Sequence, residues 1–219
     1  MFVKICGIKT PDFAAQCFEL GADMIGLVHY PPSPRHVDTE QIRAITKVVT
    51  PFRHNGKFVT LVVVDPEPAE MMRLLDACEH EIDCLQLHGK QQTISLPNCH
   101  INLIRVVRDE QTCQTLLQQN QGIQQKAKPH LPQFVFELSR GTLPGGNGKT
   151  WDWSMARSFC KRFPTLIAGG VSLDNIGDVI REAAPFGVDL SSGVESSPGI
   201  KNMNKLQHFF EILRELQHE

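Results

Sequence analysis

Two residues that lie far apart in the sequence, Cys6 and Glu137, could act together as a base and an acid. Cys6 ends a short apolar run, and Glu137 directly follows Phe134–Phe136. A thiolate can take a proton from carbon when nearby cationic or hydrogen-bonding groups lower its pKa, and a carboxyl group can give a proton to an oxygen. The simpler interpretations are that Cys6 is a small buried core residue and that Glu137 is a rim carboxylate paired with Arg140.

Other residues could bind the anionic parts of a ligand. Gly169 and Gly170 follow one apolar run, and Ser192 and Gly193 follow the next. Small residues at such neighbouring strand ends leave backbone N–H groups open to a phosphate, although glycines also end strands for steric reasons. Arg35 could hold a carboxylate through two parallel hydrogen bonds, and otherwise it is a solvated loop charge.

Two common motifs are missing from the sequence, which contains neither a phosphate-binding glycine loop ending in Lys-Ser/Thr nor a Gly-x-Ser-x-Gly nucleophile elbow. A metal site also gains little support. Four potential ligands fall within eleven residues, but their spacing fits no common zinc pattern: Cys78, His80, Cys84 and His88. We therefore predict that the protein uses no metal.

The elements that must position these residues are eight short predicted strands that alternate with helices. Most of the strands are apolar along their whole length, as expected for strands covered on both faces. With roughly 27 residues per unit, the pattern predicts a single-domain eight-stranded parallel (β/α)8 TIM barrel over residues 1–219. An open doubly wound sheet is the alternative, but its glycine fingerprint after the first strand is missing. The predicted strands are Val3–Cys6, Met24–Val28, Phe58–Val64, Cys84–Leu87, Asn102–Val107, Phe134–Phe136, Leu166–Ala168 and Val188–Leu190.

Three helix starts carry recognisable capping residues. Thr10 precedes a helix that Gly21 can end, and Asp38 with Gln41 three residues later forms a capping box. Ser172 is predicted to cap a third helix. In a barrel of this kind the active groups lie at the carboxyl ends of the strands, which is where the candidate residues fall.

The composition is that of an ordinary globular protein, with 41% hydrophobic and 21% charged residues. A net charge of −2 argues against nucleic acid or an anionic membrane surface as a partner. The first residues carry no secretion signal, and the odd number of cysteines, seven, suits free thiols in a reducing compartment. We therefore predict a cytoplasmic protein that does not enter a membrane.

Six short segments occur in order along the chain, namely Lys4–Ile8, Tyr30–Val37, Leu85–Gly89, Gly145–Ser154, Ala168–Gly170 and Val188–Glu195. Together they give the chain, from Lys4 to the final helix, a resemblance to the phosphoribosylanthranilate isomerases of tryptophan biosynthesis. It implies a barrel enzyme without a cofactor that performs an Amadori rearrangement. N-(5-phosphoribosyl)anthranilate becomes 1-(2-carboxyphenylamino)-1-deoxyribulose 5-phosphate when an acid opens the furanose ring and a base removes the proton from sugar C2.

The resemblance also implies residue roles. The family's base maps to Cys6, and its acid position maps to Glu137. Arg35 would contact the anthranilate carboxylate, and Asp189 would lie near the sugar hydroxyls. The barrel mouth would be lined by Gln86 and His88, in a structural or a catalytic role, and the backbone of Gly169, Gly170, Ser192 and Gly193 would hold the phosphate. The expected partner is this small phosphorylated substrate, and the protein would be a monomer or a homodimer.

Two positions depart from the family pattern. Glu137 stands where the family usually has aspartate, and His29 replaces an apolar aromatic residue. Glutamate extends about one methylene further, and a misplacement of about 1 Å can cost about a hundredfold in rate. His29 is interpreted either as a packing variant or as an adjustment to the longer acid. The substitutions leave two other functions open, namely a related isomerase of another phosphorylated aminoaldose and a non-catalytic binder of a phosphorylated ligand.

Overall fold

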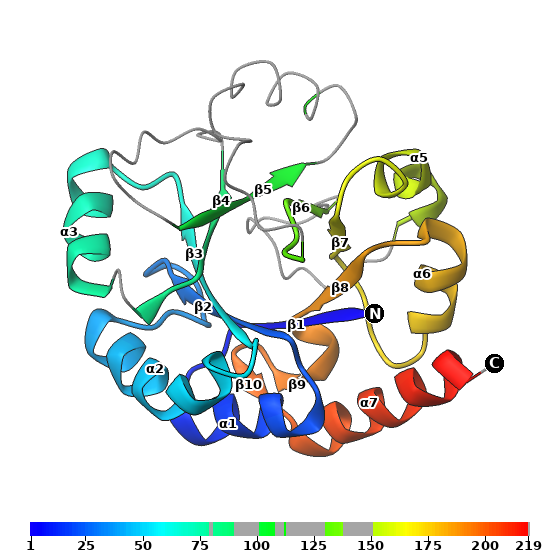
Figure 1. Ribbon diagram of the computed structural model, residues 1–219, viewed down its shortest axis with the longest axis horizontal. Helices are drawn as coiled ribbons and strands as arrows, with labels where there is room; N and C mark the ends of the chain where they lie inside the picture. The colour runs from blue at the N-terminus through cyan, green and yellow to red at the C-terminus, as the bar shows by residue number, and fades with distance from the viewer. Residues whose placement is uncertain (79–80, 90–100, 108–111, 113–129, 138–150, 219) are drawn as a thin grey trace.

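The protein forms a closed barrel of eight parallel strands surrounded by helices, as Figure 1 shows. The computed structural model describes residues 1–78, 81–89, 101–107, 112, 130–137 and 151–218. Each strand pairs with the next along the chain, and the eighth pairs with the first, which confirms the predicted fold. The strands are β1 (Phe2–Cys6), β2 (Met24–His29), β3 (Phe58–Val64), β4 (Cys84–His88), β5 (Asn102–Val107), β6 (Phe134–Phe136), β7 (Thr165–Ile167) and β8 (Gly187–Leu190).

Side chains alternate between the inside of the barrel and the layer of helices, because successive residues of a strand point to opposite faces. On β4, Leu85 and Leu87 pack in the cluster between strands and helices, whereas Cys84 packs inside the barrel. Gln86 and His88 lie two and four residues after Cys84 and line a pocket at the carboxyl ends of the strands. The polar mouth of the barrel therefore rests on an apolar interior made of Met24, Cys84, Ile104, Val106, Leu131, Val135, Leu166 and Ala168.

The two helices nearest the start of the chain begin as the sequence predicts. In α1 (Pro11–Leu20) the backbone N–H of Phe13 donates to the side chain of Thr10, and Gly21 ends the helix with a φ of 122°. In α2 (Thr39–Arg53) the capping box of Asp38 and Gln41 is complete. The other helices are α3 (Pro68–Cys78), α5 (Arg157–Cys160), α6 (Ile176–Ala183) and α7 (Met203–His218), with a 3-10 turn η3 (Trp153–Ala156) before α5.

The predicted start of α6 is wrong. The helix begins at Ile176 rather than directly after Ser172, and its N-cap residue is Asn175. The backbone N–H of Ser172 donates to Asn175 Oδ1 over 2.9 Å, and Asn175 Nδ2 donates to the Gly170 carbonyl over 2.8 Å. The asparagine therefore holds the segment between β7 and α6 in a turn, which postpones the helix by one turn.

A small hairpin follows the barrel strands and was not predicted from the sequence. After β8, a 3-10 turn η4 (Ser192–Val194) leads into β9 (Glu195–Ser197), which pairs antiparallel with β10 (Ile200–Lys201). Gly199 in the turn has a φ of 82°, and a Cβ atom there would lie 2.3 Å from the Pro34 carbonyl oxygen. The hairpin therefore packs closely against the loop between β2 and α2.

Candidate active site

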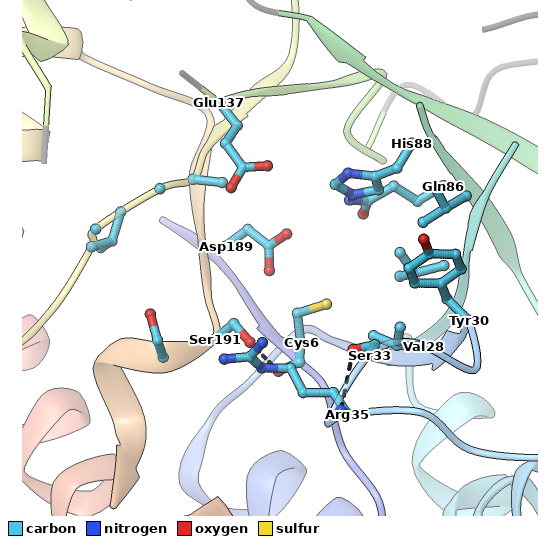
Figure 2. A pocket seen from close by; sticks show the side chains of 17 residues that line it. Cys6, Val28, Tyr30, Ser33, Arg35, Gln86, His88, Glu137, Asp189 and Ser191 are labelled. Carbon is cyan, nitrogen blue, oxygen red and sulfur yellow. Dashed lines mark hydrogen bonds between the residues drawn. The ribbon is translucent and has the colours of Figure 1, made fainter. Parts of the chain in front are cut away.

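The carboxyl ends of the strands surround one pocket that brings most of the predicted site residues together (Figure 2). The empty space in the pocket measures about 790 Å³, which includes the part open to solvent at its mouth. Its lining includes nine of the residues singled out in the sequence, which are Cys6, Arg35, Gln86, His88, Glu137, Gly169, Gly170, Asp189 and Ser192. Gly193 is not among the lining residues, although it directly follows Ser192, which is.

Cys6 and Glu137 point into the pocket from different walls of the barrel (Figure 2). Cys6 is the last residue of β1, and Glu137 follows β6, where its backbone N–H donates to the Val107 carbonyl over 3.0 Å. The Glu137 side chain is buried. Gly26 of β2 makes room for the thiol, because a Cβ atom there would lie 2.8 Å from Cys6 Sγ. The pocket therefore holds a potential base and a potential acid with space for a ligand between them.

A buried ion pair beside Cys6 was missed by the sequence analysis. Lys4 is fully buried, and its Nζ lies 2.6 Å from Asp189 Oδ2 across the paired strands β1 and β8. Burial opposes the charge of Lys4, but Asp189 and Cys6 hold the pKa of its ammonium above the usual value. The available signal was the spacing, since a lysine two residues before Cys6 in an apolar strand must share its face.

The same cluster sets the protonation of Cys6 and leaves one acceptor open. Burial raises the pKa of the Cys6 thiol and the Asp189 carboxylate adds to this, while the ammonium groups of Lys4 and Lys201 act in the opposite direction. Asp189 Oδ1 is buried and accepts no hydrogen bond from the described residues. This oxygen is therefore available to a hydroxyl group of a ligand in the pocket.

Gln86 and His88 contact each other on the opposite side of the pocket. Gln86 Nε2 lies 2.7 Å from His88 Nε2, so with the amide as donor the ring nitrogen accepts and a neutral imidazole carries its proton on Nδ1. Gln86 Oε1 is buried and has no partner among the described residues. Both side chains therefore lie where the sequence analysis placed them, and Gln86 offers a second open acceptor.

Arg35 is buried in an ion-pair network rather than solvated. Its Nε and Nη2 donate to Glu195 Oε1 and Oε2 over 2.8 and 2.7 Å, and Lys201 Nζ donates to Glu195 Oε1 over 2.8 Å. Burial opposes the charge of Glu195, but Arg35 and Lys201 hold the pKa of its carboxyl below the usual value. Burial lowers the pKa of the Lys201 ammonium. The interpretation of Arg35 as a solvated loop charge is wrong, and sequence reasoning missed Glu195 and Lys201.

The loops after β7 and β8 meet at small residues. Gly169 and Gly170 have φ values of 82° and 78°, which is the left-handed region that favours glycine. A Cβ atom on Gly193 would lie 2.1 Å from the Val171 carbonyl oxygen. The loop after β8 can therefore approach Val171 this closely only with glycine at position 193, and Gly169, Gly170 and Ser192 line the pocket.

Three further expectations concern His29, a metal site and the membrane. His29 Nδ1 lies 2.9 Å from the Val37 carbonyl oxygen, and its ring packs on His36 with centroids 5.1 Å apart, which supports the packing interpretation. Within the described residues no three His, Cys, Asp or Glu side chains gather closely enough to hold a metal ion, and His80 lies outside those residues. None of the helices in the described ranges is long and apolar enough to cross a bilayer.

Comparisons with known proteins place the chain. A family model for N-(5'-phosphoribosyl)anthranilate (PRA) isomerase matches residues 3–212. The N-(5'-phosphoribosyl)anthranilate isomerase of Desulfatibacillum aliphaticivorans is 34% identical over 95% of this chain and 91% of its own length. Among solved structures, the phosphoribosylanthranilate isomerase of Thermotoga maritima superposes with a TM-score of 0.76 at 28% identity, covering 98% of this chain and 99% of that one.

Another solved structure is that of a phosphoribosyl anthranilate isomerase in complex with reduced 1-(o-carboxyphenylamino)-1-deoxyribulose 5-phosphate. It is similar to this chain with a TM-score of 0.73 and 27% identity, covering 98% of this chain and 99% of that one. The family match spans every strand from β2 to β8 and all but the first residue of β1. The chain therefore belongs to the N-(5'-phosphoribosyl)anthranilate isomerase family.

Proposed function

We propose that Cys6 and Glu137 are the base and the acid with which this chain performs the reaction of its family. The chain is an isomerase of N-(5'-phosphoribosyl)anthranilate in tryptophan biosynthesis, an aldose–ketose isomerase. The observation that supports the two roles is that both side chains point into one pocket from different walls of the barrel (Figure 2).

The rearrangement needs one proton donor and one proton acceptor. The Glu137 carboxyl gives a proton to the furanose ring oxygen, so the C1–O bond breaks and an iminium forms between C1 and the anthranilate nitrogen. The Cys6 thiolate then takes the proton from C2, and the electron pair of that C–H bond forms the enolamine, which becomes the 2-ketone. Lys4 and Lys201 favour the thiolate that this step requires.

The remaining pocket residues suit the three parts of the substrate. Arg35 donates to the anthranilate carboxylate, and Asp189 Oδ1 accepts from a sugar hydroxyl. The backbone of the loops after β7 and β8 binds the phosphate, and Gly193 contributes by allowing the two loops to approach each other. The phosphate-binding residues of this proposal are Gly169, Gly170, Ser192 and Gly193.

Variants of the two proposed catalytic residues test the roles directly. We expect Cys6→Ala and Glu137→Gln each to lower kcat on freshly formed N-(5-phosphoribosyl)anthranilate by about a hundredfold or more, because each step loses its proton carrier. Cys160→Ala, at a cysteine outside the pocket, is the matched control and should keep full activity. Full activity of both pocket variants would refute the assignment.

The length of the acid can be tested in the same assay. Glu137→Asp restores the residue that the family usually has but withdraws the carboxyl by one methylene, so an adapted pocket loses rate by about tenfold to a hundredfold. Faster turnover by this variant would mean that Glu137 is a compromised acid. The match over residues 3–212 favours this isomerase over an isomerase of another aminoaldose and over a non-catalytic binder.

The proposal also covers the protein as a whole. Residues 1–219 act as one barrel domain, as a monomer or homodimer in the cytoplasm, on a small phosphorylated substrate and without nucleic acid. The net charge of −2 supports the last point, since it gives the surface no excess of cations.

A further inference from the structure

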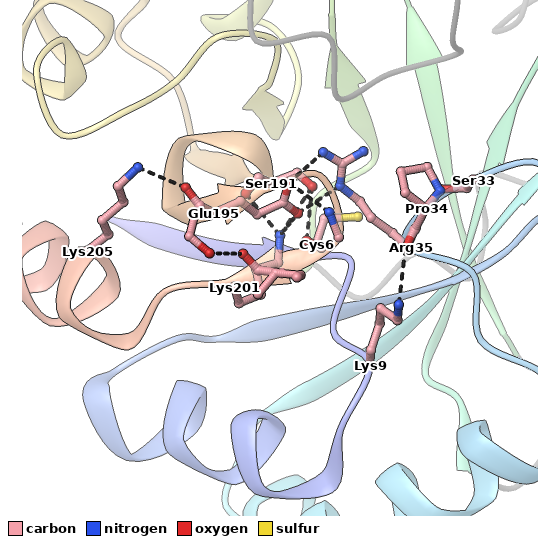
Figure 3. A network of polar contacts seen from close by, with 12 residues as sticks. Cys6, Lys9, Ser33, Pro34, Arg35, Ser191, Glu195, Lys201 and Lys205 are labelled. Atoms are coloured by element: carbon pink, nitrogen blue, oxygen red, sulfur yellow. Dashed lines mark hydrogen bonds and ion pairs between the residues drawn. The ribbon is translucent and has the colours of Figure 1, made fainter.

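Glu195 joins three segments that meet at the rim of the pocket. It begins β9 and is 5% exposed. Its Oε1 accepts from Arg35 Nε and Lys201 Nζ, both over 2.8 Å, and its Oε2 accepts from Arg35 Nη2 over 2.7 Å and from the Gly199 N–H over 3.3 Å (Figure 3). Four donors occupy the acceptor sites of the carboxylate, so Glu195 has no capacity left for a ligand.

The contact with Glu195 fixes the plane of the Arg35 guanidinium. Two parallel hydrogen bonds through Nε and Nη2 define both its position and its rotation. Among the described residues, no acceptor contacts Arg35 Nη1, and Arg35 lines the pocket together with Cys6. The free edge of the guanidinium is therefore the part that can donate to a carboxylate in the pocket.

The rest of Arg35 is held independently of Glu195. A Cβ atom on Gly7 would lie 2.6 Å from Arg35 Cδ, so the aliphatic stem lies directly on the Gly7 backbone beside Cys6. The Arg35 N–H donates to Ser33 Oγ over 3.1 Å. Removing the charge of Glu195 would leave this stem in place and release only the orientation of the guanidinium.

The hairpin that carries Glu195 is itself tied to the segment that carries Arg35. Gly199 approaches the Pro34 carbonyl, and Lys205 of α7 donates to the Glu195 carbonyl oxygen over 2.8 Å. Lys201 Nζ also donates to the Ser191 carbonyl over 2.9 Å, and Ser191 Oγ donates to the Cys6 carbonyl over 3.1 Å. The hairpin that carries Glu195 is thus held in place by contacts other than those of the carboxylate itself.

We propose that Glu195 is a positioning residue that gives the pocket its preference for a carboxylated substrate by fixing the free edge of Arg35. The inference rests on the proposed role of Arg35 as the contact to the anthranilate carboxylate. A purely structural ion pair would act differently, because its loss would lower the turnover of every substrate by the same factor.

The test compares two substrates that differ only in the carboxylate, N-(5-phosphoribosyl)anthranilate and N-(5-phosphoribosyl)aniline. We expect Glu195→Gln to lower kcat/KM about 30-fold for the first, mainly through KM, and at most about threefold for the second. In an Arg35→Met background, Glu195→Gln should not change the ratio of kcat/KM for the two substrates any further, because the contact through which Glu195 acts is already lost. Glu211→Gln, at an exposed glutamate of α7, is the control.

A second variant and a binding measurement complete the test. If Glu195→Gln does not fold, Glu195→Asp retains the charge but is one methylene too short to accept from both Arg35 Nε and Arg35 Nη2, and it should show the same selectivity loss to a smaller extent. If the wild type turns over neither substrate, the proposed catalytic roles fail, and calorimetric affinities for the reduced product and for its analogue without the carboxylate still decide the positioning role. Equal losses for both ligands, or the absence of any preference in the wild type, would overturn the proposal.

Discussion

The ion-paired side chains near Cys6 carry one positive charge in excess. Three cations and two carboxylates form two connected groups, namely Lys4 with Asp189, and Arg35 and Lys201 with Glu195. Burial and the Asp189 carboxylate favour the neutral thiol, and the ammonium groups of Lys4 and Lys201 oppose them. Ionisation of Cys6 would bring the buried cluster to neutrality, which gives a physical reason why a buried cysteine can serve as a base at this position.

Lys4→Met tests this account at a single residue. Without the ammonium group, less of Cys6 is ionised at neutral pH, so we expect kcat/KM at pH 7 to fall about tenfold or more and to recover in part as the pH is raised. The variant should also lose about 3–5 kcal/mol of stability, because Asp189 stays buried without its partner. A pH–rate profile and urea unfolding measure the two effects, with Lys47→Met on the exposed face of α2 as control. A profile that falls equally at every pH would contradict the electrostatic role.

The functional residues that could be predicted from the sequence differ from the missed ones in their position relative to the strands. Cys6 and Glu137 lie at strand ends, where the architecture alone makes a reactive side chain conspicuous. Lys4 lies inside β1, where only its spacing of two residues from Cys6 indicates that it shares the same face, and Glu195 lies beyond the last barrel strand. Their partners, Asp189 and Arg35, are 185 and 160 residues away, a pairing that only the closed barrel creates.

At the scale of elements, helix starts that depend on one local capping signal were predicted correctly, whereas a start that depends on two competing capping residues was not. The caps of α1 and α2 depend on residues within one turn, so their sequences suffice. The start of α6 depends on a choice between Ser172 and Asn175, and the hydrogen bonds of Asn175 to its neighbours decide it. The β9–β10 hairpin has strands of three and two residues, too short to show a pattern, and its position depends on a contact with the distant Pro34.

A pair of glycine variants tests the contact between this hairpin and the loop after β2. Gly199→Ala would place a Cβ atom 2.3 Å from the Pro34 oxygen, whereas Gly56→Ala has the same kind of left-handed φ, 79°, with nothing within 4 Å. Both should lose about 1–2 kcal/mol from backbone strain. Only Gly199→Ala should also raise KM, by about fivefold to tenfold, because the displaced hairpin moves Glu195 and with it Arg35.

Thermal unfolding and steady-state kinetics on N-(5-phosphoribosyl)anthranilate separate the two contributions. The Gly56 variant is the measure of strain alone. Identical kinetics of the two variants would show that the hairpin contact does not reach the pocket.

At the scale of the whole molecule, the count and order of the strands determine where the site lies. Eight parallel strands close in sequence order, so β1 and β8, from the two ends of the chain, become neighbours and bring Lys4 to Asp189. The strand count could be read from the sequence because most strands are buried on both faces and are therefore mainly apolar. Which interior side chains pair with each other could not, since that depends on the register around the closed barrel.

At the scale of the whole molecule, the Glu195 network should make the free energy of unfolding depend on pH. The folded protein holds the pKa of Glu195 below its ordinary value of 4.5. A carboxyl group with a lowered pKa binds fewer protons in the folded than in the unfolded state, so its contribution is fully present above about pH 4.5 and is lost as the pH falls through the lower, folded value.

At pH 7, Glu195→Gln should cost about 3–5 kcal/mol of stability, because Arg35 and Lys201 remain buried without their anion. Urea unfolding of the wild type and this variant should give a difference that is constant from pH 7 to pH 5 and shrinks below pH 4.5. The exposed Glu211→Gln variant should differ little from the wild type throughout, and a Glu195 difference that persisted unchanged in acid would show that the network does not depend on the carboxylate charge.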